Sequence, residues 1–198
     1  MDNITNFNPN DYGFLFAGLL GRERLNPLGR GKPISDLYEE LHSLTLDKAF
    51  FGSKIVDQDM ANACFSGLWL LFNFLEESHT ICQSIETITG SFWHGIMHRR
   101  EGDFFNSKYW FRRVGEHPIF PDLQRVAKEL ASAVESHPSI SFLNTQSQWS
   151  PFNFVDLVEA CLSTKSPYEL LCRGSFCGRN GCASLHHRPG GSGPADGP

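Results

Sequence analysis

The chain has 198 residues, of which 40% are hydrophobic and 20% are charged. These proportions are typical of a globular domain and exclude a collagen-like chain, a coiled-coil rod and a wholly disordered chain. Acidic residues outnumber basic ones by 22 to 17, so the formal net charge is -5. We therefore expect neither nucleic acid nor an anionic membrane surface as a partner.

The N-terminal region is expected to be irregular. Residues 1–34 are rich in Asn, Gly and Pro and contain one short apolar anchor, Phe14 to Leu20. Met1 is not followed by a basic segment and an apolar run, so we expect no secretory signal and a cytoplasmic protein, in which disulfide bonds are rare. Ser35 is well suited to cap the first substantial helix, which places leucines along one face.

The longest predicted helix begins at Asp57 or Asp59 and continues to about Ser78. It contains the most apolar stretch of the chain, residues 60–75. A membrane-spanning helix needs about 20 residues with few polar interruptions, and this stretch is shorter and contains asparagine and serine. It therefore predicts a central helix of the core and no membrane association.

Residues 92–172 continue the helical pattern. The predicted helices are 92–101, capped by Thr89 or Ser91; 107–114, capped by Asn106; 121–135, opened by Pro121; one opened by Pro151; and a last one opened by Pro167. Since no segment alternates with period two, the predicted fold class is all-α, an irregular or orthogonal bundle of about seven to eight helices. We expect a helical domain at 35–172 and a low-complexity, disordered tail at 173–198, where Gly and Pro are frequent.

The densest polar chemistry lies in a histidine-rich segment of one predicted helix. His94, His98 and Glu101 are spaced i, i+4 and i+7, which places them on one helix face. Two imidazoles one turn apart can converge on one transition-metal ion. Upstream, Glu76 and His79 form a Glu-x-x-His pair, the unit that di-iron helical bundles use in duplicate.

These residues predict two roles. As a metal site, His79, His94, His98 and Glu101 would hold a divalent ion such as Zn, Fe or Mn. As catalytic residues, His94 or His98 would act as general base and Glu101 would orient or ligate. The alternative is that the histidines are hydrogen-bonded residues of the core, because pairs at this spacing also arise by chance.

A group of basic residues overlaps and follows the histidines, interleaved with aromatic side chains. Its predicted ligand-binding members are Arg99, Arg100, Lys108 and Arg112. Arginine offers a fork of donors for carboxylate or phosphate, so the leading prediction is a small-molecule enzyme or binder for an anionic ligand, with or without a metal. Two alternatives remain open: internal ion pairs that join helices, and a non-catalytic interaction domain whose basic and aromatic strip docks an acidic partner.

The six cysteines fall into two groups. Cys64, Cys82 and Cys161 lie in apolar helical patterns and are predicted to be buried. The second group has the spacing Cys-x4-Cys-x4-Cys-x3-His and consists of Cys172, Cys177, Cys182 and His186. This spacing is similar to that of CCCH zinc fingers and meets the ligand count for tetrahedral zinc. The alternative is an unstructured tail that contains cysteine.

Several stretches of the sequence resemble a family of bacterial proteins. The longest are WHGIMHRREGD at 93–103, NSKYWFRRVG at 106–115 and the following His117-Pro118. The segment from Gly67 to His79 shares the likeness, which covers roughly residues 12–172. That family is uncharacterised, so the resemblance implies no activity, fold or cofactor.

Overall fold

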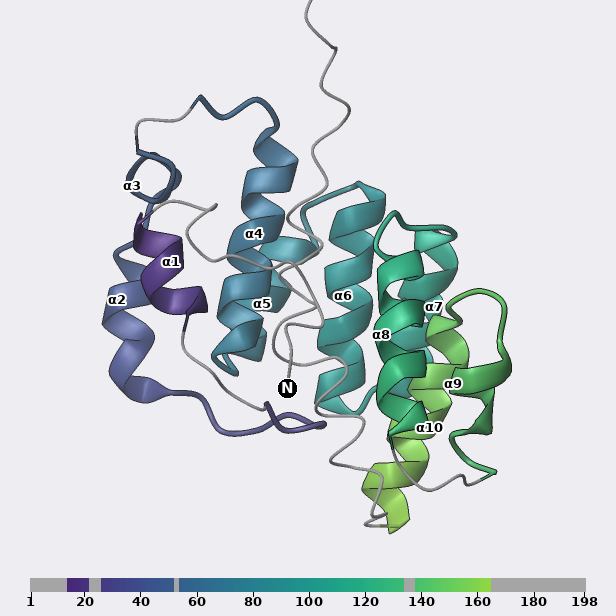
Figure 1. The fold of residues 1–198 in the computed structure, drawn as a ribbon. Coiled ribbons are helices and arrows are strands. Elements are labelled where there is room, and N and C mark those ends of the chain that lie inside the picture. The colour runs from purple at the N-terminus through teal and green to yellow at the C-terminus, as the bar shows by residue number, and fades with distance from the viewer. Residues whose placement is uncertain (1–13, 22–25, 52–53, 134–137, 165–198) are drawn as a thin grey trace, which may run out of the picture.

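The computed structural model describes residues 14–21, 26–51, 54–133 and 138–164, and every regular element in these ranges is helical (Figure 1). The α-helices are α1 (Phe14–Leu20), α2 (Tyr38–His42), α3 (Leu46–Ala49), α4 (Gln58–Leu71), α5 (Leu75–Cys82), α6 (Ile88–Glu101), α7 (Phe104–Val114), α8 (Phe120–Ser132), α9 (Ser141–Thr145) and α10 (Pro151–Thr164). A 3-10 turn, η2 (Ser35–Leu37), precedes α2. The predicted all-α class is confirmed, but the described part alone holds ten α-helices rather than about seven to eight.

The helix predicted from Asp57 or Asp59 to Ser78 is divided into α4 and α5, which corrects the prediction. Asn73 lies between them in the left-handed region, with φ at 67°. Asparagine adopts this conformation more readily than most residues because its short side chain bonds locally or to nearby backbone. Here its amide group donates to the Lys32 carbonyl at 2.9 Å and its oxygen accepts from Arg100 at 2.5 Å. These contacts hold the break between the two helices.

Side-chain caps fix the starts of α4 and α6. The carboxylate of Asp57 accepts a backbone N–H of the first turn of α4, one of the two predicted starts. α6 begins earlier than predicted, because the cap is the hydroxyl of Thr87 and neither Thr89 nor Ser91. A Thr cap satisfies one of the four backbone donors that a helix leaves unpaired at its start. The earlier start gives α6 an additional turn.

The cap of α7 is Asp103, which corrects the prediction of Asn106. The Asp103 carboxylate accepts from the backbone N–H of Asn106 at 3.0 Å and from its side-chain amide at 2.7 Å. A charged acceptor is favoured at a helix N-terminus because it also interacts with the helix dipole. Ser35 is not the predicted cap either, since it lies inside η2 without a side-chain cap hydrogen bond. Pro121 and Pro151 lie in the first turns of α8 and α10, as expected.

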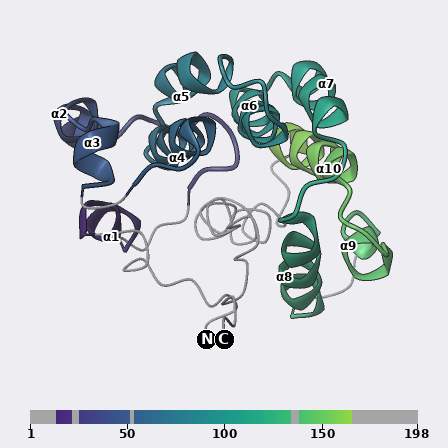
Figure 2. The same ribbon diagram turned by 90° about the horizontal axis from the view of Figure 1, so that it is seen from above.

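α6 is the helix that joins the parts of the fold. It packs against α4, α5 and α7, and Figure 2 shows it between the helices α1–α5 and the helices α7–α10. Its Phe92 belongs to a buried cluster with α7–α10, whereas Trp93 and Met97 belong to a buried cluster with α4 and α5. A third cluster packs α1–α3 against α4. Residues on different faces of α6 are therefore buried in different clusters.

Three further predictions concern the cysteines, membrane spanning and the C-terminal region. Cys64, Cys82 and Cys161 are buried, as predicted. Among the described helices, none has the length and apolar character needed to cross a bilayer. The helix expected after Pro167, the tail at 173–198 and the predicted zinc ligands Cys172, Cys177, Cys182 and His186 lie outside the described residues.

Candidate metal centre

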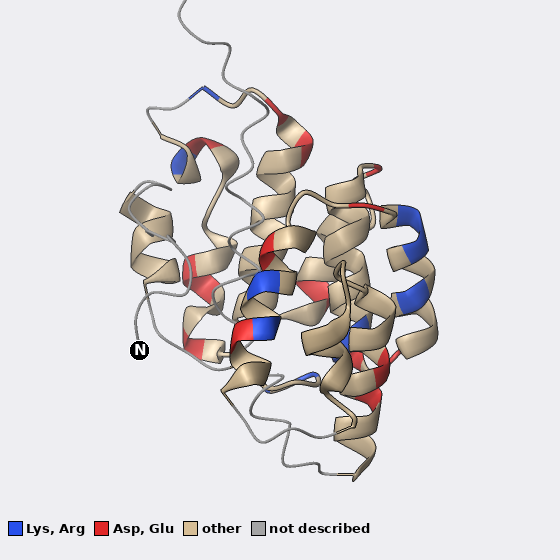
Figure 3. Ribbon diagram, turned by 45° about the vertical axis from the view of Figure 1, so that its right-hand side comes forward, with Lys and Arg blue, Asp and Glu red and all other residues tan. Residues whose placement is uncertain are grey.

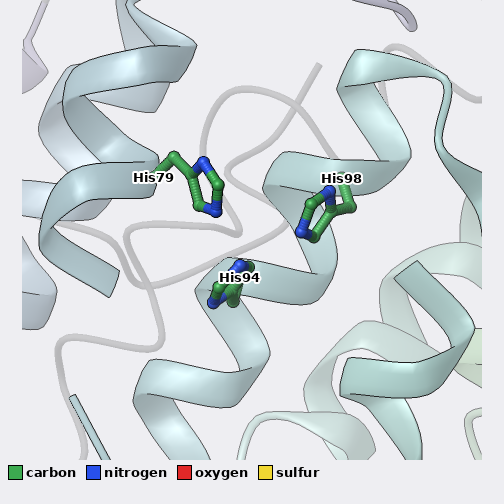
Figure 4. Close-up of side chains that lie close together, drawn as sticks. All are labelled: His79, His94 and His98. Carbon is green, nitrogen blue, oxygen red and sulfur yellow. The ribbon is translucent and has the colours of Figure 1, made fainter. Parts of the chain in front are cut away.

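Three histidines from two helices come together where α5 packs against α6. His79 lies on α5, and His94 and His98 lie one turn apart on α6. One ring nitrogen of each residue lies within 4.8 Å of the others. Figure 4 shows the three rings around a common space. The packing of α5 against α6 thus adds His79 to the two histidines that share one face of α6.

The three histidine rings take two relative orientations. The rings of His94 and His98 are stacked at 4.8 Å with an interplanar angle of 17°. The ring of His79 stands edge-on to both, at 4.8 and 5.2 Å. Zinc binds imidazole nitrogens at about 2.0–2.1 Å, which places tetrahedral donors roughly 3.3 Å apart. The three nitrogens lie within 4.8 Å of one another, so the side chains would have to rotate to reach that spacing.

The two histidines of α6 are held in the neutral form. The side chain of His94 is buried, and burial lowers its pKa from 6.5 to about 3, with smaller contributions from the nearby His98 and His79. Burial and His79 also lower the pKa of His98, and the neighbouring carboxylates of Glu101 and Asp103 only partly oppose this. A metal ligates the neutral imidazole. Both side chains therefore have a free lone pair at neutral pH.

His94 carries an unpaired polar atom in the interior. Its Nδ1 is buried and has no hydrogen-bond partner within the described part of the chain. Unpaired buried polar atoms are uncommon because they lose their interaction with water without a replacement. The Trp110 ring of α7 covers His94 at 3.8 Å and 15°, and Arg113 lies over the same indole at 5.1 Å. Trp110 therefore covers one face of the His94 ring.

Glu101 lies next to the histidines but in a different place from that expected of a shared ligand. Its Oε2 is 3.2 Å from Nδ1 of His98, and it does not belong to the group of side chains whose donor atoms converge. Glu76, which the sequence pairs with His79, forms an exposed ion pair with Arg30. The described centre is accordingly a set of three imidazoles with one carboxylate beside it.

Arg99 and Arg100, predicted to bind an anion, are buried in the protein interior. Arg100 donates to the carbonyls of Leu70 at 2.6 Å and Gly29 at 3.3 Å, as well as to Asn73. Arg99 lies over the Phe154 ring at 5.3 Å. Successive residues of an α-helix are turned by about 100°, so both arginines leave α6 on other faces than His98. Of the two alternatives, these contacts with described carbonyl and amide groups favour an internal role.

The two predicted basic residues of α7 differ from each other. Lys108 forms an ion pair with Asp156 of α10, whereas Arg112 is exposed. In the view of Figure 3, basic residues are distributed over several helices. The structure therefore brings His79, His94, His98 and Glu101 together and directs Arg99, Arg100 and Lys108 to other partners.

Two residues that matter at this site were missed in the sequence. Trp110 covers His94 from a neighbouring helix, and Asn73 connects Arg100 to the break between α4 and α5. Neither contact can be recognised from the neighbouring sequence, because each depends on how two helices pack.

Comparison with known proteins found no relative of this chain. No family model, curated protein or solved structure matches it.

Proposed function

We propose that the protein binds a divalent transition-metal ion through His79, His94 and His98. The observation that carries the proposal is the convergence of one ring nitrogen from each side chain within 4.8 Å. The neutral state of the two buried histidines and the unpaired Nδ1 of His94 support it. Imidazole ligands suit zinc and iron, whereas manganese prefers oxygen ligands. Zn²⁺ or Fe²⁺ is therefore the favoured ion.

Three neutral ligands leave the charge of the ion uncompensated. Zinc sites with three protein ligands generally bind water or substrate at the fourth position. A bound water loses a proton more easily than free water and becomes a nucleophile near neutral pH. The centre is thus suited to a small-molecule enzyme or binder in which the metal, rather than Arg99 or Arg100, holds the anionic ligand.

Metal analysis of the untagged protein tests this proposal. We expect about one equivalent of zinc or iron after reconstitution and dialysis, as for a site that binds more tightly than surface groups. His94→Gln should lose the ion, whereas His42→Gln, at an exposed position of α2, should keep it. Less than about 0.1 equivalent in the wild-type protein, or equal binding by both variants, would overturn the proposal.

A second candidate function, docking of an acidic partner, is supported by the outer face of α7. Phe105 and Tyr109 are 78% and 44% exposed, and Arg112 and Arg113 on the same helix are also exposed. Exposed aromatic and arginine side chains are typical of interaction surfaces. A fluorescent glutamate-rich peptide that contains aromatic residues is expected to bind at low ionic strength. An Arg112→Glu, Arg113→Glu double variant should bind it less, and equal binding by both proteins would exclude this role.

A further inference from the structure

The contact between Glu101 and His98 links the metal centre to the end of α6. Glu101 is the last residue of the helix, three positions after His98, and its Oε2 lies 3.2 Å from His98 Nδ1. In Figure 4, the edge of the His98 ring that is farther from the α6 backbone faces His79 and His94. The near nitrogen of this ring is therefore engaged by Glu101, and the far nitrogen, Nε2, is directed toward the other histidines.

We infer that Glu101 is a positioning residue, which keeps the proton of His98 on Nδ1 and so makes Nε2 the atom that ligates the ion. The inference rests on the proposed function. An ionised carboxylate only accepts hydrogen bonds, and a neutral imidazole carries one N–H. Pairing with Glu101 therefore requires the N–H at Nδ1 and leaves the lone pair at Nε2. Carboxylates in this relation to a ligating histidine fix its tautomer and ring orientation and strengthen it as a ligand.

The end of α6 holds Glu101 in place for this role. Gly102 follows it with a left-handed φ of 94°. The backbone N–H groups of Gly102 and Asp103 donate to the His98 carbonyl at 3.1 and 2.9 Å. These two bonds close the helix end, as in common glycine-terminated helices. They therefore fix the backbone of Glu101 relative to that of His98.

The carboxylate of Glu101 is partly exposed and is not one of the converging donor groups. Its side chain is 33% exposed. It lines a surface hollow with Phe105 of α7 and Glu159 of α10, so solvent reaches the carboxylate. His94, by contrast, has no hydrogen-bond partner at Nδ1 among the described residues. Removal of the carboxylate is thus expected to affect His98 and to leave the tautomer of His94 unchanged.

The first test uses the metal-free protein. Nitrogen-15 NMR of labelled histidines distinguishes a ring protonated at Nδ1 from one protonated at Nε2. In the wild-type protein, His98 is expected to be protonated at Nδ1, and Glu101→Gln should remove this preference. Glu159→Gln is the matched control, because Glu159 lines the same hollow on another helix. A wild-type His98 protonated at Nε2, or an unchanged His98 signal in Glu101→Gln, would overturn the inference.

The second test measures zinc affinity by competition with a chelator. Glu101→Gln is expected to bind zinc about 10–100-fold more weakly than the wild type, the usual effect of losing such a partner. Glu159→Gln should match the wild type, and far-UV circular dichroism should show that all three proteins are folded. Equal zinc affinity in Glu101→Gln and wild type would contradict a positioning role.

Failure of the inference and failure of the proposed function are distinguishable. If the wild-type protein binds no metal, the proposed function is wrong, and the NMR experiment still decides whether Glu101 sets the tautomer of His98. If the wild type binds zinc and Glu101→Gln binds it equally well, the metal centre stands and only the role of Glu101 is rejected.

Discussion

Arg100 places a positive charge in the interior, where its partners among the described residues are mostly backbone carbonyls. It is 3% exposed and donates to carbonyls of the 29–30 segment, to Leu70 and to Asn73. Hydrogen bonds that involve a charged group are stronger than neutral ones, and unpaired buried acceptors are costly. Arg100 therefore attaches the 29–30 segment and the end of α4 to α6.

Replacement of Arg100 by methionine is expected to destabilise the protein by about 3 kcal/mol, because several buried carbonyls lose their donor. Urea denaturation followed by circular dichroism measures the change. Arg112→Met, at an exposed position of α7, should change the free energy of unfolding by less than about 0.5 kcal/mol. Similar losses in both variants would argue against the interior role of Arg100.

His94 should make the stability of the metal-free protein depend on pH. Its pKa is about 3 in the folded state and 6.5 for the ordinary side chain. As the pH falls below 6.5, the unfolded chain binds a proton that the folded chain does not, so stability is lost. The contribution of His94 is about 3 kcal/mol between neutral pH and about pH 4.

Denaturation of the chelator-treated protein across this pH range measures the loss. His94→Gln should lose less stability on acidification than the wild type. The comparison is needed because His94 has other ionisable side chains around it, namely His79, His98, Glu101 and Asp103. Identical pH profiles for the two proteins would show that His94 is not held neutral by the fold.

At the scale of elements, the approach of α4 to α6 depends on a small residue facing a large one. Gly67 of α4 faces the buried Trp93 of α6, and a Cβ at position 67 would lie 2.6 Å from the indole atom Cζ2. Non-bonded carbon atoms do not approach so closely, so a larger residue would have to displace the indole or the helix. Met97 of α6 is buried in the same cluster as Trp93.

Gly67→Ala is therefore expected to destabilise the protein by about 2 kcal/mol through overpacking. Gly18→Ala in α1 is the control, because a Cβ there meets no atom within 4 Å. That substitution should be stabilising by about 0.5–1 kcal/mol, as alanine is the better helix residue. Thermal denaturation of the two variants gives both values, and a neutral Gly67→Ala would show that the contact can relax.

At the scale of the whole molecule, α6 joins the buried clusters on both sides of it. Phe92 belongs to the cluster with α7–α10, and Trp93 to the cluster with α4 and α5. A metal ion held by His79 and the two histidines of α6 would add a further connection between α5 and α6. Ligands that bind only the folded state stabilise it in proportion to their concentration relative to Kd.

Zinc at about 100 times its Kd is expected to stabilise the protein by about 2.7 kcal/mol and to raise its Tm by about 5–10 °C. Differential scanning calorimetry with zinc, and after addition of chelator, measures this change. The His79→Gln variant should show no zinc-dependent increase. An equal increase in that variant would place the bound zinc elsewhere on the protein.

The helix boundaries show which features of the helices the local sequence pattern can predict. Helical periodicity correctly indicates the α6 and α7 segments, but several neighbouring residues are suitable as caps. The choice of Thr87 over Thr89, or of Asp103 over Asn106, depends on where the chain leaves the helix. The break at Asn73 is likewise set by partners distant in sequence, Lys32 and Arg100.

The all-α class and the one-turn spacing of His94 and His98 are determined by the sequence itself, because both depend on the order of residues within single helices. Only the tertiary structure adds His79 from α5 and Trp110 from α7, since their positions depend on packing between helices. It also decides that Arg99 and Arg100 point into the interior. The surroundings of each arginine depend on the face of α6 from which its side chain projects and on the segments that cover that face. A run of neighbouring residues does not reveal which segments these are.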